Sequence, residues 1–147
     1  MKIACKINNK EYTFDSSPTK RVLDIVRENG ITSIKEGCGE GECGACSIFY
    51  NGKLVNSCLL VASQIDGAEI LTLEGLLAET KAIRESFVEE GAVQCGFCTG
   101  GFVLRAYDYA KSNGVKDEQA LKDALDGNLC RCTGYQKIVE AILKSMK

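Results

Sequence analysis

Apolar and polar residues alternate along the first part of the chain, as they do in half-buried strands. IACKI, residues 3–7, shows this alternation and is followed by Asn8–Asn9 and KEYTF, residues 10–14. Asparagine tolerates the left-handed conformations of tight turns, so this stretch predicts a β-hairpin. The segments SIFY and KLVNS flank Asn51–Gly52 and predict a second hairpin. AEILTL, residues 68–73, predicts a last strand.

Helical patterns appear once in this first part and dominate the second part. Residues 17–30 carry helix signals, with Ser17 as a candidate N-cap, Pro18 in the first turn and Gly30 as a stop. Beyond residue 77, apolar residues recur at helical spacing and place three or four amphipathic helices. The stretches concerned are residues 79–91, 99–114, 117–127 and 135–147.

The change from strands to helices without alternation predicts an α+β fold of two domains, residues 1–76 and 77–147. We expect the first to be a small sheet wrapped around one helix and the second to be all helical. Two domains of this size bury less surface than one domain of 147 residues. Each therefore needs a staple such as a metal or a disulfide.

Composition narrows the classes of function. The net charge is −2 and no basic stripe occurs, so we expect no nucleic-acid partner and no membrane-surface binding. The start lacks the apolar region of a secretory signal, and the longest apolar run, Cys58–Ala62, is too short to span a membrane. We therefore expect a cytoplasmic protein, in which nine cysteines indicate metal ligands rather than disulfides.

Histidine is absent from the sequence. This excludes a nucleophile activated by histidine, a zinc site with histidine ligands and a Rieske cluster. Any metal must be bound mainly by thiolates.

The first cysteine set is Cys38, Cys43, Cys46 and Cys58. Its spacing, C-x4-C-x2-C followed by a fourth cysteine, is that of plant-type [2Fe–2S] ligands. Glycines at positions 37, 39, 41 and 44 allow positive φ angles and let backbone amides face the sulfurs. A four-cysteine zinc loop is the alternative, but such loops favour paired C-x2-C units.

The second cysteine set is Cys95, Cys98, Cys130 and Cys132. Spacing alone leaves an iron–sulfur cluster and a tetrahedral zinc ion both open. Each pair precedes a predicted helix, where the positive end of the helix dipole favours an anionic group. Cys5 lies on the apolar face of the first strand and is predicted to be an unreactive core thiol.

No sequence motif indicates a binding site for a flavin, a nicotinamide or a substrate. No GxGxxG or phosphate-binding loop occurs, and the scattered acidic residues are those of solvated faces and caps. The chain is therefore predicted to carry electrons rather than to transform a substrate.

The segments GCGEGECGAC, QCGFCTGG and LCRCTGY, in this order, resemble the small iron–sulfur subunit of the molybdenum hydroxylases. This family includes enzymes of the xanthine dehydrogenase, aldehyde oxidoreductase, nicotinate dehydrogenase and carbon monoxide dehydrogenase types. The resemblance covers essentially the whole chain. It implies a β-grasp ferredoxin domain followed by a four-helix domain, with one [2Fe–2S] cluster in each.

The resemblance also implies cofactors and partners. The first cysteine set would hold the cluster nearer an FAD-binding medium subunit, and the second set the cluster nearer a molybdopterin-binding large subunit. Gln94 matches the glutamine that contacts the pterin in this family. Gly100 stands where the family usually has proline, which affects local rigidity but no ligand. The substrate is selected by the molybdenum subunit and is not encoded here.

Three functions follow as hypotheses. The first is an electron-transfer subunit of a molybdopterin-dependent oxidoreductase, which relays single electrons through two [2Fe–2S] clusters to a flavin. The second is a free ferredoxin-like carrier that docks transiently with several partners. The third is a zinc-stabilised interaction module.

Overall fold

The structure of the chain is a computed structural model that describes residues 1–112 and 114–146. Its sheet has five strands in the order β2-β1-β5-β3-β4. The two outer pairs are antiparallel hairpins, while the central strands β1 and β5 run parallel to each other. This confirms the α+β class, with a mixed sheet in the first half. The strands are β1 (Lys2–Ile7), β2 (Lys10–Asp15), β3 (Ser47–Tyr50), β4 (Lys53–Asn56) and β5 (Glu69–Leu71).

Both predicted hairpin turns are confirmed. Asn8 and Asn9 have φ angles of 53° and 67°, and Asn51 and Gly52 have φ angles of 48° and 84°. Two successive left-handed residues match the twist of the flanking strands, which is why these dipeptides close the hairpins.

The helix of the first half, α1 (Val22–Glu28), packs its apolar side on the sheet. It ends before Gly30, which has a φ of +83° as the sequence predicted. The predicted start at Ser17 is wrong, because Arg21 is the N-cap and is extended. Arg21 forms an isolated antiparallel bridge with Val61, and this pairing keeps the preceding residues out of the helix.

Residues 77–112 and 114–146 contain four α-helices, within the three or four predicted. They are α2 (Lys81–Glu89), α3 (Thr99–Ser112), α4 (Glu118–Ala124) and α5 (Gln136–Ser145). The predicted helical stretches 99–114 and 135–147 also include Asn113 and Lys147, which lie outside the described residues. Short 3-10 helices connect the elements; these are η1 (Ser57–Leu59), η2 (Ala62–Gln64), η3 (Leu73–Gly75) and η4 (Leu125–Gly127).

None of the helices within residues 1–112 and 114–146 is long and apolar enough to cross a membrane.

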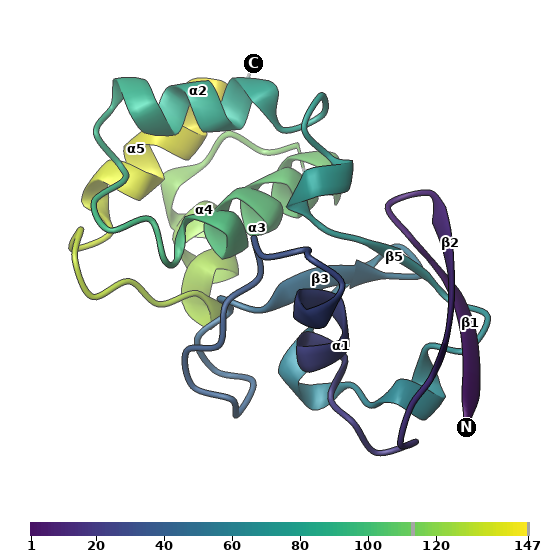
Figure 1. The fold of residues 1–147 in the computed structure, drawn as a ribbon. Helices are drawn as coiled ribbons and strands as arrows, with labels where there is room; N and C mark the ends of the chain where they lie inside the picture. Colours follow the sequence, from purple (N-terminus) through teal and green to yellow (C-terminus); the bar gives the residue numbers. More distant parts are fainter. Residues whose placement is uncertain (113, 147) are drawn as a thin grey trace.

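Each half has its own apolar core. One core lies between α1 and the sheet, and the other lies among the four helices, which form a separate layer beside the sheet in Figure 1. A smaller cluster of Phe49, Leu76 and Leu104 joins the two layers. Within this contact the ring of Tyr107 on α3 meets that of Phe49 on β3 edge to face, with centroids 5.9 Å apart. The two halves are therefore packed together, and the loops that bear the cysteines lie between and beside them.

Candidate metal centres

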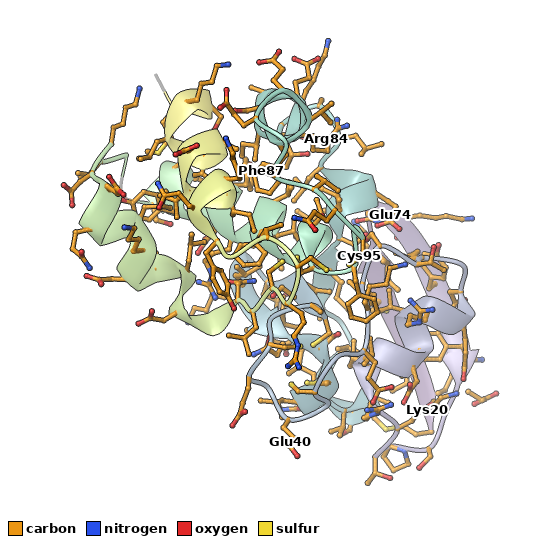
Figure 2. The ribbon with its side chains drawn as sticks, turned by 90° about the vertical axis from the view of Figure 1, so that its left-hand side faces the viewer. Lys20, Glu40, Glu74, Arg84, Phe87 and Cys95 are labelled. Atoms are coloured by element: carbon orange, nitrogen blue, oxygen red, sulfur yellow. The ribbon has the colours of Figure 1, made fainter. Side chains whose placement is uncertain are left out.

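Backbone N–H groups surround the sulfur of Cys38. The amides of Glu40, Glu42 and Cys43 donate to its Sγ over 3.3, 3.3 and 3.4 Å. Gly39 and Gly41 have φ angles of +68° and +79°, and these left-handed steps turn the intervening amides inward. The glycine-rich loop thus lines the sulfur with main chain, as its sequence predicted. Glu40 lies at the tip of this loop and points away from the molecule in Figure 2.

The other sulfurs of the first set also receive amides. The Sγ of Cys43 accepts from the N–H groups of Cys38 and Ala45 over 3.4 and 3.5 Å. The Sγ of Cys46 accepts from the N–H of Cys58 over 3.4 Å. Cys58 lies on η1, and both it and Cys46 are buried. Such donors stabilise thiolates and the sulfurs of an anionic cluster.

The second set is built from the two loops that precede α3 and α5. The Sγ of Cys95 accepts from the amide of Phe97 over 3.5 Å and lies 3.6 Å from the Sγ of Cys132. The Sγ of Cys130 accepts from both the amide and the hydroxyl of Thr133, over 3.4 and 3.1 Å. Figure 2 places Cys95 where the helical layer meets the sheet half.

Within each set the thiols influence one another, and the Sγ atoms of Cys95 and Cys132 lie 3.6 Å apart. Backbone N–H groups have the largest effect on the pKa of Cys38, and burial has the largest effect on the pKa of Cys58 and Cys98. A side-chain hydrogen bond with a neighbouring thiol contributes in each case, and the pairs are Cys38 with Cys43, Cys58 with Cys46, and Cys98 with Cys130. A [2Fe–2S] cluster requires two cysteines on each iron, because bridging sulfides occupy the other positions. Two pairs in each set match that requirement. Within residues 1–112 and 114–146, no group of three or more histidine, cysteine or acidic side chains is placed to hold a single metal ion.

A cavity of about 630 Å³ lies between the two sets. Cysteines of both sets line it, and apolar side chains surround them. The cavity is lined by Cys38, Cys43, Cys95, Cys98, Cys130 and Cys132, with Phe97, Leu129 and Tyr135 among the other residues. Paired thiols, inward-facing amides and a cavity beside them together fit an inorganic iron–sulfur group.

The thiol pKa values differ with their surroundings. The three backbone N–H groups around Cys38 lower the pKa of its thiol to about 7. Burial, with Cys46 alongside, raises the pKa of Cys58 to about 11. Burial, with Cys130 alongside, raises the pKa of Cys98 to about 12. Burial also disfavours the thiolate of Cys130, but the hydrogen bonds from Thr133 outweigh it and lower that pKa.

The remaining predicted residues lie as follows. Gln94 is exposed, immediately before Cys95. Gly100 lies in the first turn of α3, where a Cβ would stand 3.1 Å from the backbone oxygen of Ser33. Cys5 is buried on the sheet, and burial followed by the charge of Asp66 raises the pKa of its thiol, in agreement with a core role.

Sequence reasoning missed residues that support the sites. Thr133 and Tyr135 both belong to the CRCTGY segment, and the hydroxyl of Tyr135 accepts the N–H of Cys130 over 3.1 Å. Both residues could have been predicted as supports of the site, because each has a hydroxyl group and lies within five residues of the candidate ligand Cys130. Arg21, which bonds Glu36 beside the first loop, had no such signal.

Comparison with known proteins matches each half of the chain to a domain that binds a [2Fe-2S] cluster. Residues 5–73 match a 2Fe-2S iron-sulfur cluster binding domain, and residues 72–143 match a [2Fe-2S] binding domain. The chain is 44% identical over 143 residues to the nicotinate dehydrogenase small FeS subunit of Eubacterium barkeri, covering 95% of this chain and 91% of that one. It is 38% identical over 149 residues to the xanthine dehydrogenase iron-sulfur-binding subunit of Escherichia coli O157:H7, covering 99% and 94%.

A solved structure agrees. A chain of quinoline 2-oxidoreductase from Pseudomonas putida 86 superposes with a TM-score of 0.91 at 40% identity, covering 97% of this chain and 90% of that one. Two matched cluster-binding regions on an α+β fold define an iron–sulfur protein. The chain belongs to the family of small iron–sulfur subunits of the molybdenum hydroxylases. It is therefore an electron-transfer subunit of an oxidoreductase, as the resemblance implied.

Proposed function

We propose that the first cysteine set, Cys38, Cys43, Cys46 and Cys58, holds one [2Fe–2S] cluster and that the second set, Cys95, Cys98, Cys130 and Cys132, holds another. The observation that carries this proposal is that six of the eight thiols line one cavity, with the sulfurs of Cys95 and Cys132 3.6 Å apart. The inward-facing amides around Cys38 and the two hydrogen bonds from Thr133 to Cys130 support it. We also propose that the halves are domains, residues 1–76 and 77–147, which their separate cores support.

The chain's residues then have distinct tasks. Each bound cluster would supply reversible uptake of one electron. The loop amides stabilise the thiolates, and burial of Cys46 and Cys58 excludes water from one side of the first site. Cys95 and Cys132 are exposed, so the second site opens toward a partner.

The exposed second set would face one partner. It would take electrons from a molybdopterin cofactor on a large partner subunit, and the first set would pass them to FAD on a medium subunit. Gln94, exposed beside Cys95, would contact the pterin. The relatives named as nicotinate and xanthine dehydrogenase subunits support this assignment. We also propose that this subunit acts in the cytoplasm.

The test measures iron and acid-labile sulfide per chain, together with electron paramagnetic resonance after dithionite reduction. Four irons, four sulfides and two distinct signals are expected. Cys132→Ser should remove one signal and Cys58→Ser the other, while Cys5→Ala, the matched control, should keep both. Zinc at either site, or one signal lost equally from both serine variants, would refute the proposal.

Size-exclusion of the native extract separates a subunit from a free carrier. The exposed Phe97, Leu129 and Tyr135 around the cavity favour a lasting interface, because such side chains are costly to leave in water. Co-elution with two larger chains is expected, and elution as the lone chain would favour the free carrier.

A further inference from the structure

The hydroxyl of Thr133 differs from the other groups that surround the cysteine sulfurs. It donates to the Sγ of Cys130 over 3.1 Å, and the backbone N–H of the same residue donates to this sulfur over 3.4 Å. Among residues 1–112 and 114–146, the other donors to the eight sulfurs, thiols aside, are backbone N–H groups. Within this part of the chain, Thr133 therefore supplies the one side-chain hydroxyl that is hydrogen bonded to a candidate ligand.

Tyr135 holds this hydroxyl in place. The N–H of Tyr135 donates to the Oγ1 of Thr133 over 3.2 Å, and the phenol oxygen of Tyr135 accepts the N–H of Cys130 over 3.1 Å. A closed ring of hydrogen bonds thus connects Cys130, Thr133 and Tyr135. A sulfur that is bound to iron has no hydrogen of its own, so the hydroxyl of Thr133 can only donate to it.

The backbone of Tyr135 has a conformation that aromatic residues rarely adopt. Its φ angle is +73°, and that of the preceding Gly134 is +69°. These two left-handed residues turn the chain back, which directs the N–H and the phenol of Tyr135 toward Thr133 and Cys130. Such a backbone is strained for a bulky residue, and the surrounding structure must hold it. The ring of Phe102, which is fully buried, lies 6.4 Å from the ring of Tyr135 between centroids and anchors it to the helical core.

We propose that the hydroxyl of Thr133 raises the reduction potential of the group held by the second cysteine set. The inference rests on the proposed function, which places a [2Fe–2S] cluster there. Uptake of one electron increases the negative charge on the sulfurs. A hydrogen directed at the Sγ of Cys130 therefore stabilises the reduced form more than the oxidised form. The hydrogen stays on the Oγ1 of Thr133, and no bond forms or breaks.

Burial strengthens this effect. Cys130 is 9% exposed and Thr133 is half-buried, so little water is available to replace the hydroxyl as a donor. A hydrogen bond is electrostatically stronger where water is excluded than in solution. The competing interpretation is that Thr133 only shapes the loop before α5, in which case its removal would alter cluster retention but not the potential.

Thr133 and Thr99 offer matched variants. Thr133→Val removes the hydroxyl and keeps both the N–H and the branched shape, whereas Thr133→Ser keeps the hydroxyl. Thr99 follows Cys98 of the same set and is also half-buried. Among residues 1–112 and 114–146, its hydroxyl makes no hydrogen bond to a sulfur. Thr99→Val is therefore the same chemical change at a position without the proposed interaction.

The experiment uses the full chain with four irons and four sulfides bound. A redox titration followed by electron paramagnetic resonance gives the midpoint potential of each cluster, and Cys132→Ser and Cys58→Ser assign the two signals. In Thr133→Val we expect a lower potential for the second cluster and an unchanged potential for the first. Thr133→Ser and Thr99→Val should shift neither. Pulsed resonance in D2O should show the loss of one exchangeable hydrogen coupling from the second signal of Thr133→Val.

An unchanged potential in Thr133→Val, with both clusters bound, would overturn the role of Thr133 and leave the proposed function standing. An equal shift in Thr99→Val would do the same. Fewer than two clusters in the unmodified chain would overturn both. If Thr133→Val does not bind the second cluster, Thr133→Ala is titrated against Thr133→Ser. A lower potential in the alanine variant then supports the proposal, and equal potentials refute it.

Discussion

Arg21 and Glu36 are joined by two hydrogen bonds, of 2.6 and 3.2 Å, which tie the start of α1 to the start of the first cysteine loop. The same guanidinium binds Asp24 through two more, of 2.8 and 2.9 Å. A Cβ on Gly39 would stand 3.2 Å from the carboxylate of Glu36 and 3.7 Å from Arg21. The guanidinium therefore braces the loop that carries Cys38.

Replacing Arg21 with glutamine should loosen this loop. We expect Arg21→Gln to lose the first cluster faster in the presence of an iron chelator, while the second cluster is lost at its original rate. Absorbance and paramagnetic resonance follow the two losses. Lys20→Gln is the control. The Nζ of Lys20 lies 2.5 Å from the Oε2 of Glu28 on α1, so this ion pair does not involve the loop of Cys38. Equal effects of both variants would contradict the bracing role.

The Arg21–Glu36 pair should also depend on pH. The hydrogen bond from Arg21 lowers the pKa of Glu36. The pair therefore stabilises the fold fully above the ordinary carboxyl pKa, and this contribution is lost as the pH falls through the lowered value. We expect the unmodified chain to have a higher free energy of unfolding than Glu36→Gln at neutral pH, measured by denaturant unfolding, with the difference shrinking as the pH falls through the lowered pKa of Glu36. A difference that is independent of pH would contradict this.

Gly44 and Gly52 offer a matched comparison of strain and contact. Both have positive φ angles, +74° and +84°, so alanine is strained at either position. Only at Gly44 would a Cβ also collide, 2.4 Å from Asn128; at Gly52 it would meet no atom within 4 Å. We expect Gly44→Ala to perturb the resonance signals of both clusters and Gly52→Ala to perturb neither. Identical spectra from the two variants would count against contact between the loops.

Phe87 and Val88 are neighbours on α2, but Phe87 is buried in the core and Val88 is exposed on the surface. Phe87 is 1% exposed within the helical core, where Figure 2 shows it, whereas Val88 is 75% exposed. Phe87→Ala should lower the free energy of unfolding by about 3–5 kcal/mol because it leaves a cavity. Val88→Ala should change it by less than about 0.5 kcal/mol. Denaturant unfolding of the two variants measures both values.

Local patterns were sufficient for much of this fold. Asn8–Asn9 and Asn51–Gly52 predict their hairpins because the backbone preference lies in the dipeptides themselves. Asp117, the predicted start of a helical stretch, is the N-cap of α4, and its carboxylate accepts the N–H of Ala120 over 2.8 Å. The cysteine spacing indicated two candidate thiolate sites because most neighbouring cysteines within a set are separated by only one to four residues.

Contacts between distant segments were not predictable in the same way. The start of α1 was misplaced because Arg21 pairs with Val61, and no nearby residue signals a bridge that spans forty positions. The hydrogen bond from the N–H of Leu129 to the carbonyl oxygen of Cys43 likewise depends on the packing of the two halves. Such contacts arise from the tertiary arrangement, which overrides local helix signals.

The parallel pairing of β1 (Lys2–Ile7) with β5 (Glu69–Leu71) orders events during biosynthesis. Lys6 and Ile7 of β1 pair with Glu69 and Ile70 of β5. The centre of the sheet can therefore form only after Glu69 and Ile70 have left the ribosome. All four thiols of the first set lie on the chain between these strands. A nascent chain that stops short of β5 would carry them on an unclosed sheet, open to oxidants. Strand closure thus sets the earliest moment at which the four thiols can be held in their folded arrangement.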